Sequence, residues 1–340
     1  MIELIAKAKN QYKANLHCHS VLSDGHKTPQ ELKEMYRAHG YSVLSITDHE
    51  VPFNHSNLAE KDFLMLTGYE AYIRPDPSAV YDPYSPEIHL NLFAKEPENE
   101  TFICYNPSYA KYIHRTRPPE ELKRAGSERT REYNLAYIQE FIDTARENGY
   151  LVSYNHPYWS MESEETILSY QNCFSMEICN GSSRLSNGLE YNAPLYDRML
   201  LAGKHIFCHA GDDNHNTAPD GSAGSDSFRA YTYILADELT YPAIIRAMEK
   251  GDFYASRGPV LHAVSADGRK IHVECSPAKH IYVYTGSKSP LRVHAEDGAC
   301  LTCADLEVDK RARYVRVSVF DESGNSADTR GFFPEELGWC

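Results

Sequence analysis

The hydrophobic pattern of roughly the first 250 residues switches repeatedly between the two-residue period of strands and the 3.6-residue period of helices. Short apolar runs predict the strands, and amphipathic stretches with N-terminal caps and C-terminal glycines predict the helices between them. The predicted strands cover 42–47, 63–70, 88–93, 150–157, 174–181, 205–210 and 229–235, and the predicted helices cover 28–40, 132–148, 189–202 and 241–250.

Strands that alternate with helices in this way predict an α/β fold, a parallel barrel with its functional face at the carboxyl ends of the strands. About seven such strands are present, so we expect a distorted seven-stranded (β/α)7 barrel over residues 1–258. The pattern lapses between about 97 and 131, which we interpret as a basic insertion. Residues 259–340 carry short alternating segments separated by turn pairs, and they predict a small C-terminal all-β sandwich domain.

Side chains able to bind a metal follow the predicted strands. His17 and His19 lie two residues apart, so a strand would point both imidazoles to the same side, and Asp24 returns from the loop that follows. The strand-end set of candidate metal ligands is His17, His19, Asp24, His49, Glu70, His89, His156, Asp213 and His215. Asp213 is two residues from His215 and faces the same side, whereas Asp212 is out of phase and points the other way.

Nine nitrogen and oxygen ligands are too many for one tetrahedral zinc site. They suit two or three divalent ions, such as Mn, Fe or Zn, bridged by a carboxylate or hydroxide. Such an arrangement is suited to the hydrolysis of a phosphate ester.

The order of these motifs resembles the PHP family, the polymerase and histidinol phosphatase domains, over roughly residues 10 to 258. The resemblance is carried by His17-Cys18-His19 with Asp24-Gly25, Asp48-His49, Gly68-Tyr69-Glu70, His89, Asn155-His156-Pro157 and Asp213-Asn214-His215. The segment Phe253–Pro259 is similar to the one that ends the domain in two-domain phosphoesterases of this family.

The resemblance implies a trinuclear site. One metal would be held by His17, His19, Glu70 and Asp213, a second by Glu70, His89 and His156, and a third by Asp24, His49 and His215. Arg257, in the family-like segment, is the first candidate for a catalytic arginine that contacts the phosphoryl group; a structural contact between domains is an equal alternative. We expect Asp48 to orient a ligand histidine.

The stretch from Lys111 to Arg131 holds seven basic residues in a chain whose formal net charge is −14. It is either a solvated loop or a lid that meets an anionic substrate. Arg115 and Arg117 in this stretch, and Arg184 outside it, are further candidates for substrate binding, beside Arg257.

The net charge, the hydropathy and the cysteine spacing limit the partners and the compartment that we expect for this protein. A net charge of −14 disfavours binding of long nucleic acid. The sequence lacks an apolar run of membrane-spanning length and the apolar core of a secretory signal, so we expect a cytoplasmic protein without a membrane partner. The nine cysteines have no framework spacing and predict reduced thiols, and Cys300-x-x-Cys303 is interpreted as two ordinary loop cysteines.

These features predict a metal-dependent phosphoric ester hydrolase that acts on a small phosphorylated molecule, such as a nucleotide or sugar phosphate, through a metal-bridging hydroxide. One alternative is an exonuclease on short oligonucleotides, which the basic stretch keeps open. Another is a non-catalytic, metal-stabilised binding module, which the complete ligand set disfavours.

Overall fold

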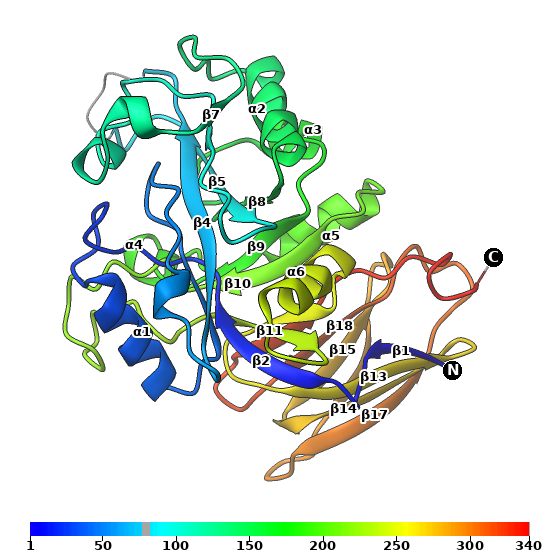
Figure 1. Ribbon diagram of the computed structural model, residues 1–340. Coiled ribbons are helices and arrows are strands. Elements are labelled where there is room, and N and C mark those ends of the chain that lie inside the picture. Colours follow the sequence, from blue (N-terminus) through cyan, green and yellow to red (C-terminus); the bar gives the residue numbers. More distant parts are fainter. Residues whose placement is uncertain (77–81, 340) are drawn as a thin grey trace.

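The computed structural model describes residues 1–76 and 82–339, and its main feature is one large sheet (Figure 1). Its strand order is β10 (Phe207–Gly211), β9 (Ser175–Asn180), β8 (Tyr150–Tyr154), β5 (Ile88–Ala94), β4 (Leu64–Ile73), β3 (Val43–Ile46), β2 (Asn10–Asn15), β11 (Tyr231–Ala236), β12 (Phe253–Ser256), β19 (Ser326–Thr329), β18 (Arg316–Phe320), β15 (His280–Tyr284) and β16 (Leu291–His294). A second sheet contains β1 (Ile2–Ile5), β13 (Leu261–Asp267), β14 (Lys270–Ala278) and β17 (Leu301–Glu307). A short pair joins β6 (Phe102–Ile103) to β7 (Arg124–Ala125).

The helices lie among the strands of the first 250 residues. They are α1 (Pro29–Ala38), α2 (Leu135–Glu147), α3 (Glu164–Ser169), α4 (Ser183–Ser186), α5 (Ala193–Leu201) and α6 (Tyr241–Lys250), with 3-10 turns at Ser56–Leu58, Ile113–Arg115 and Pro119–Glu121. The predicted capping box at Thr28 and Glu31 opens α1. The mixed α/β class and the four long predicted helices are thus confirmed.

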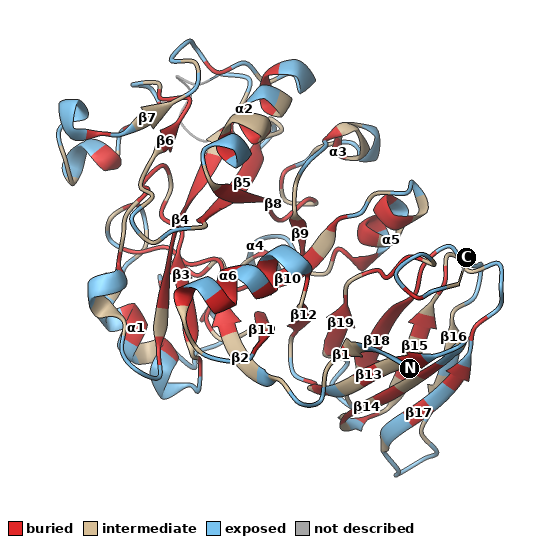
Figure 2. Cartoon of the chain, turned by 45° about the vertical axis from the view of Figure 1, so that its right-hand side comes forward, coloured by how far each residue is buried: buried red, intermediate tan, exposed pale blue. Residues whose placement is uncertain are grey.

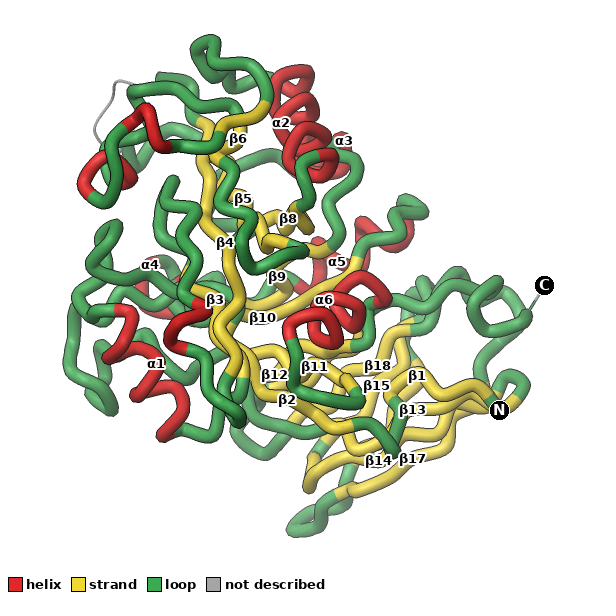
Figure 3. Tube along the Cα trace, viewed as in Figure 1, coloured by secondary structure: helices red, strands yellow, loops and turns green. Residues whose placement is uncertain are grey.

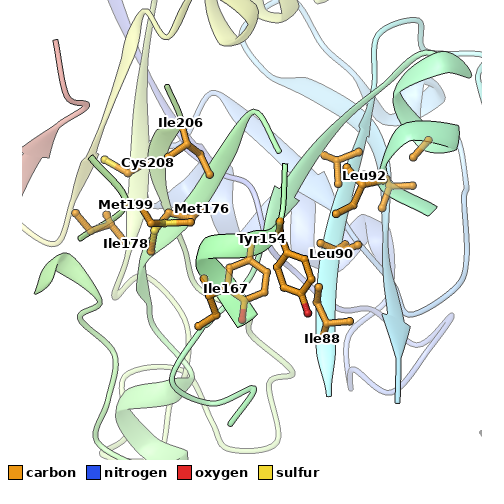
Figure 4. Close-up of a cluster of buried hydrophobic side chains, with 14 of the residues drawn as sticks. Ile88, Leu90, Leu92, Tyr154, Ile167, Met176, Ile178, Met199, Ile206 and Cys208 are labelled. Atoms are coloured by element: carbon orange, nitrogen blue, oxygen red, sulfur yellow. The ribbon is translucent and has the colours of Figure 1, made fainter. Parts of the chain in front are cut away.

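The strands of the N-terminal part are buried, and its helices expose their outer faces (Figure 2). Side chains such as Ile88, Tyr154 and Met176 pack between strands and helices in the largest hydrophobic core (Figure 4). Since packed strands fix their own ends, this core provides a rigid base for side chains that follow the strands.

The prediction of an all-parallel arrangement is wrong. β5 pairs antiparallel with both β4 and β8, and β11 pairs antiparallel with β2 and β12. A parallel neighbour needs a long crossover, usually helical, whereas the described parts of the β4–β5 connection contain no helix. Without a helical crossover, β5 runs antiparallel beside β4.

The C-terminal residues contain strands without an α-helix in the part that the structure describes (Figure 3). The two sheets share one hydrophobic core, to which Val273 of β14, Ile281 of β15 and Val317 of β18 contribute. The N-terminal β1 pairs with β13, and β12 continues the large sheet into β19. The division at residue 258 remains a prediction, because backbone pairing crosses it in both sheets.

Among the described residues, none of the helices combines the length and the apolar character needed to cross a lipid bilayer.

Candidate metal centre

The segment after β2 carries the predicted histidine pair into the middle of the fold. Backbone bonds hold it on both sides: the N–H of Thr47 donates to Cys18 O at 2.7 Å, and the N–H of His19 donates to Asn214 O at 3.0 Å. The rings of His17 and His19 are fully buried, with centroids 5.3 Å apart. The two imidazoles therefore reach one site, as their spacing predicts.

Two glycines allow the chain to approach these histidines closely. A Cβ at Gly211 would lie 2.7 Å from His17 Cβ, and one at Gly25 would lie 2.3 Å from His19 O. Any side chain at either position would displace the histidine segment.

The candidate ligands gather in three groups, within each of which the ligand atoms lie within 4.8 Å of one another. The groups are His17, His19, Glu70 and Asp213; His19, Asp24, His49 and His215; and His49, Glu70 and His89. The first matches one predicted metal position completely. The second contains the predicted set of Asp24, His49 and His215, with His19 added. In the third, His49 stands where the resemblance implied His156.

Glu70, a residue of β4, lies at the centre of the cluster of candidate ligands. Its carboxylate oxygens lie 3.0 to 3.4 Å from a ring nitrogen of each of five histidines: His17, His19, His49, His89 and His156. His156 is thus brought to the cluster through Glu70. A carboxylate with both oxygens among imidazoles is placed to bridge two cations.

Buried polar atoms without hydrogen-bond partners indicate whether a metal ion fits the site. Among the described residues, buried ring nitrogens of His17, His19 and His49 and one oxygen of Glu70 accept or donate no hydrogen bond. Leaving such atoms unpaired in the protein interior costs free energy. Divalent ions would satisfy all four, so the donor set fits a metal centre.

The pKa shifts of the candidate ligands also indicate that positive charge would stabilise this cluster. Burial disfavours the imidazolium of His17, but neighbouring carboxylates, first Asp213 and Glu177, outweigh burial and raise its pKa. Burial opposes ionisation of Glu70 as well, yet the surrounding histidines hold its pKa well below the usual range. For His49, burial prevails and lowers the pKa to about 4. A neutral His49 has a free lone pair for a metal.

Two ligands occupy left-handed backbone conformations that non-glycine residues rarely adopt. The φ angle is 23° at His156 and 54° at Asp213. Such conformations cost of order 1–3 kcal/mol each and concentrate at functional sites. Both residues are held there by the surrounding structure, at the ends of β8 and β10.

The adjacent acids Asp212 and Asp213 point to different sides. Asp213 Oδ1 lies 3.2 Å from His17 Nε2 and 3.0 Å from His19 Nε2. Asp212 is buried elsewhere and accepts hydrogen bonds from Tyr36 Oη and from the N–H groups of residues 228–230. This arrangement matches the predicted register of the two residues.

Asp48 has a different role from the one predicted. Its carboxylate accepts hydrogen bonds from the backbone N–H and hydroxyl groups of both Ser20 and Ser23, and from no histidine among the described residues. Asp48 therefore shapes the loop that delivers Asp24, and within the described residues it reaches the ring of His19 through Ser23, whose Oγ lies 3.5 Å from His19 Nδ1.

The carboxylates that do contact ligand rings were missed. Glu177 Oε1 lies 2.7 Å from His17 Nδ1, and Glu87 Oε1 lies 3.0 Å from His89 Nε2. In each ring the opposite nitrogen faces Glu70, so each outer carboxylate can fix the tautomer and orientation of a ligand. Glu177 could have been identified in the sequence, because it is a carboxylate inside the apolar run 174–181.

A pocket of about 690 Å³ lies elsewhere, and the candidate centre forms the floor of a second one of about 610 Å³. The second pocket is the candidate site although it is smaller, because the candidate metal ligands line it. Its walls include two cations, Arg74 and Lys111, and three aromatic rings, Tyr72, Tyr112 and Trp159. Neither cation was singled out in the sequence as a site residue.

The predicted substrate-binding arginines do not line this pocket in the described structure. Arg257 lies 3.5 Å from Glu190 and over the ring of Tyr191, as expected for the alternative of a structural contact. Arg117 is paired with Glu100, and Arg115 lies over the ring of Tyr112. Arg184 is exposed on α4.

Most charges of the basic stretch are neutralised within the fold. Arg124, Arg129 and Arg131 pair with Glu128, Glu140 and Glu50, respectively. The stretch nevertheless walls the pocket with Lys111 and Tyr112, as does Ser108 just before it. It is therefore mainly a packed insertion that contributes one wall.

Comparisons with known proteins were made at three levels. No family model matches the sequence, and no curated protein matches it.

Solved structures of similar shape include a two-domain protein from Bacteroides vulgatus, described as containing a predicted PHP-like metal-dependent phosphoesterase. It is 16% identical, with a TM-score of 0.47 over 98% of both chains. An amidohydrolase from Chromobacterium violaceum, solved with bound sulfate and no metal, is 15% identical, with a TM-score of 0.42 over 70% of this chain and 96% of that one.

A putative metal-dependent phosphoesterase from Bifidobacterium adolescentis is 16% identical, with a TM-score of 0.38 over 64% of this chain and 93% of that one. Two of these three structures are thus described as metal-dependent phosphoesterases, predicted in one case and putative in the other, and the third as an amidohydrolase. With TM-scores below 0.5, none of them assigns an activity to this chain.

Proposed function

We propose that this protein is a metal-dependent phosphoesterase that hydrolyses a phosphate ester of a small molecule, such as a nucleotide or sugar phosphate. The observation that carries the proposal is the convergence of five histidines on the buried carboxylate of Glu70, at the floor of a pocket. The ligand groups favour two or three ions, and their nitrogen and oxygen donors suit Mn, Fe or Zn.

Bound divalent ions would supply Lewis-acid activation of water and of the phosphoryl group. The residues of the chain would do the rest: Glu70 and Asp213 hold negative charge between the imidazoles, and Glu177 and Glu87 orient the rings of His17 and His89. Arg74 and Lys111 on the wall would attract an anionic substrate into a chain that is acidic overall.

The test is hydrolysis of 4-nitrophenyl phosphate by the purified chain, before and after removal of metal by chelation. We expect activity to disappear with the metal and to return with added Mn²⁺, Fe²⁺ or Zn²⁺, and elemental analysis to find two or three ions per chain. A metal-loaded chain that hydrolyses neither this ester nor any phosphorylated metabolite would instead indicate the binding-module alternative.

Arg74 offers a test of the substrate charge. It follows β4 on the same face as Glu70 and Tyr72, and its Nε is buried without a partner among the described residues. Arg74→Met should raise KM about tenfold and leave kcat nearly unchanged. The charge of Arg74 on the pocket wall would attract the substrate equally in the ground state and in the transition state, so its loss weakens binding without slowing the chemical step. Arg292→Met, an exposed change on β16 in the C-terminal part, is the matched control.

The exonuclease alternative is less well supported. A single-stranded substrate needs a continuous basic groove, whereas the arginines of the basic stretch are largely paired with glutamates. Degradation of a short oligonucleotide at rates above those for any mononucleotide would favour it.

We also propose that the N-terminal strands form a distorted barrel of mixed parallel and antiparallel strands, closed between β10 and β11, and that the C-terminal strands form a β-sandwich. Closure is supported by Thr232 Oγ1 of β11, which accepts from the N–H of Ala210 and donates to its carbonyl. The sandwich is supported by the core that the two C-terminal sheets share.

A further inference from the structure

The pocket of about 690 Å³ lies away from the metal centre, at the other end of three strands. It is lined by Tyr150–Val152 at the start of β8, by Cys173 and Phe174 just before β9, and by His205–Phe207 at the start of β10. Since β8, β9 and β10 are parallel, their amino ends meet here, while the metal ligands follow their carboxyl ends. The two pockets share no lining residue.

One side of this pocket is apolar. Leu168, Phe174 and Phe207 line it with partly exposed side chains, whereas Ile167, Met199 and Ile206 of the lining are buried in the main hydrophobic core (Figure 4). The volume falls within the range of pockets that bind small molecules. An apolar group of a ligand would thus be removed from water on this side.

The other side is cationic, in contrast with the acidic chain as a whole. Lys95, Arg146 and Lys204 line the pocket with a single carboxylate, Glu249, which is already paired with Lys95 at 2.7 Å. The ammonium of Lys204 is half-buried and donates to the carbonyl of Tyr170 at 2.6 Å. Within residues 1–76 and 82–339, neither Arg146 nor Lys204 pairs with a carboxylate.

Two unpaired cations beside an apolar wall are complementary to an anion with an apolar tail. Burial also lowers the pKa of Lys204, which shows that the pocket penalises the lone positive charge. A bound carboxylate would offset that penalty by forming a charge-assisted hydrogen bond. The thiol of Cys173 is held protonated by burial and adds no competing charge at neutral pH.

We propose that this pocket is a second binding site, for a small amphiphilic organic anion whose carboxylate contacts Lys204 and Arg146 and whose apolar tail contacts Leu168 and Phe174. The proposal is independent of the phosphoesterase activity, because it uses no residue of the metal centre.

The test is calorimetric titration of the full chain with octanoate, with octan-1-ol as the uncharged analogue and acetate as the head group alone. We expect one octanoate site per chain, and binding of the other two probes at least about tenfold weaker. Lys204→Met and Arg146→Gln should each weaken octanoate about tenfold, whereas Lys288→Met, at an exposed loop position, should leave it unchanged. Circular dichroism and melting of each variant confirm that it is folded.

Removal of the metal by chelation should leave octanoate binding unchanged if the two sites are separate. The proposal would be overturned by absent octanoate binding, by equal affinity in the Lys204 and Arg146 variants, by octan-1-ol binding as tightly as octanoate, or by loss of octanoate binding together with the metal.

Discussion

Individual residues at the candidate centre have roles that their neighbours in sequence do not share. Asp212 and Asp213 are adjacent, yet one is a buried acceptor for loop N–H groups and the other contacts two ligand histidines. Substitution of the same kind at each position should therefore affect different properties.

Asp213→Asn should lose most activity and some metal, because an amide removes negative charge from the cluster. Asp212→Asn should keep its metals and instead lose about 2 kcal/mol of unfolding free energy, since an amide cannot accept all four hydrogen bonds made there. Elemental analysis and urea unfolding of both variants measure the two effects. Equal metal loss in both variants would show that our register for this pair is wrong.

Glu177 is the residue whose removal best tests the outer contacts of the cluster. Glu177→Gln keeps the size of the side chain but weakens its contact with His17 Nδ1, so metal affinity should fall about tenfold or more. Competition with a chromogenic chelator measures the affinity. An affinity like that of the native chain would mean that Glu177 merely fills space beside the ring.

At the scale of elements, a buried ion pair joins the insertion to the segment that follows β3. Arg131 is paired with Glu50 beyond β3, and it also donates to the carbonyls of Tyr72, Ile103 and Cys104. This contact holds β6 against the end of β4, where the pocket wall with Lys111 begins. One buried guanidinium thus adds to the hydrophobic packing that Phe102, Ile113 and Leu122 of the insertion make with Val51.

Arg131→Met should destabilise the protein by about 3–5 kcal/mol, because it leaves the buried carboxylate of Glu50 unpaired. The double variant Glu50→Gln with Arg131→Met should recover part of this loss, since no lone charge remains. Urea unfolding measures both. If the double variant were less stable than the sum of the two single changes, burial of an unpaired charge would not be the cause.

At the scale of the whole molecule, the C-terminal strands and the metal-centre half behave structurally as one unit. β12 pairs with β19, and Arg316 of β18 is buried between Asp197 of α5 and Asp328 of β19. The two halves therefore share backbone and ionic contacts across the predicted boundary at residue 258.

We expect calorimetric unfolding in a single transition, because neither half keeps its pairing partners without the other. Arg316→Met should lower the midpoint of the whole transition, since it leaves two carboxylates without their cation. Two resolved transitions, with only one of them sensitive to this change, would instead support independent domains.

The sequence by itself was enough to predict features that depend on near neighbours. Hydrophobic period and capping located the four long helices and most strands, and two-residue spacing brought His17 and His19 to one site and Asp213 and His215 to one pocket. These features follow from backbone geometry within a few residues, so no distant contact is needed to specify them.

Only the tertiary structure decided which distant groups meet. Glu177 contacts a histidine 160 residues away, Arg74 lines the pocket whereas Arg257 does not, and β1 pairs with β13 near the other end of the chain. The antiparallel direction of β5 belongs here too. Such contacts depend on strand order, direction and register, which are set by packing of the whole molecule, and local periodicity carries no information about them.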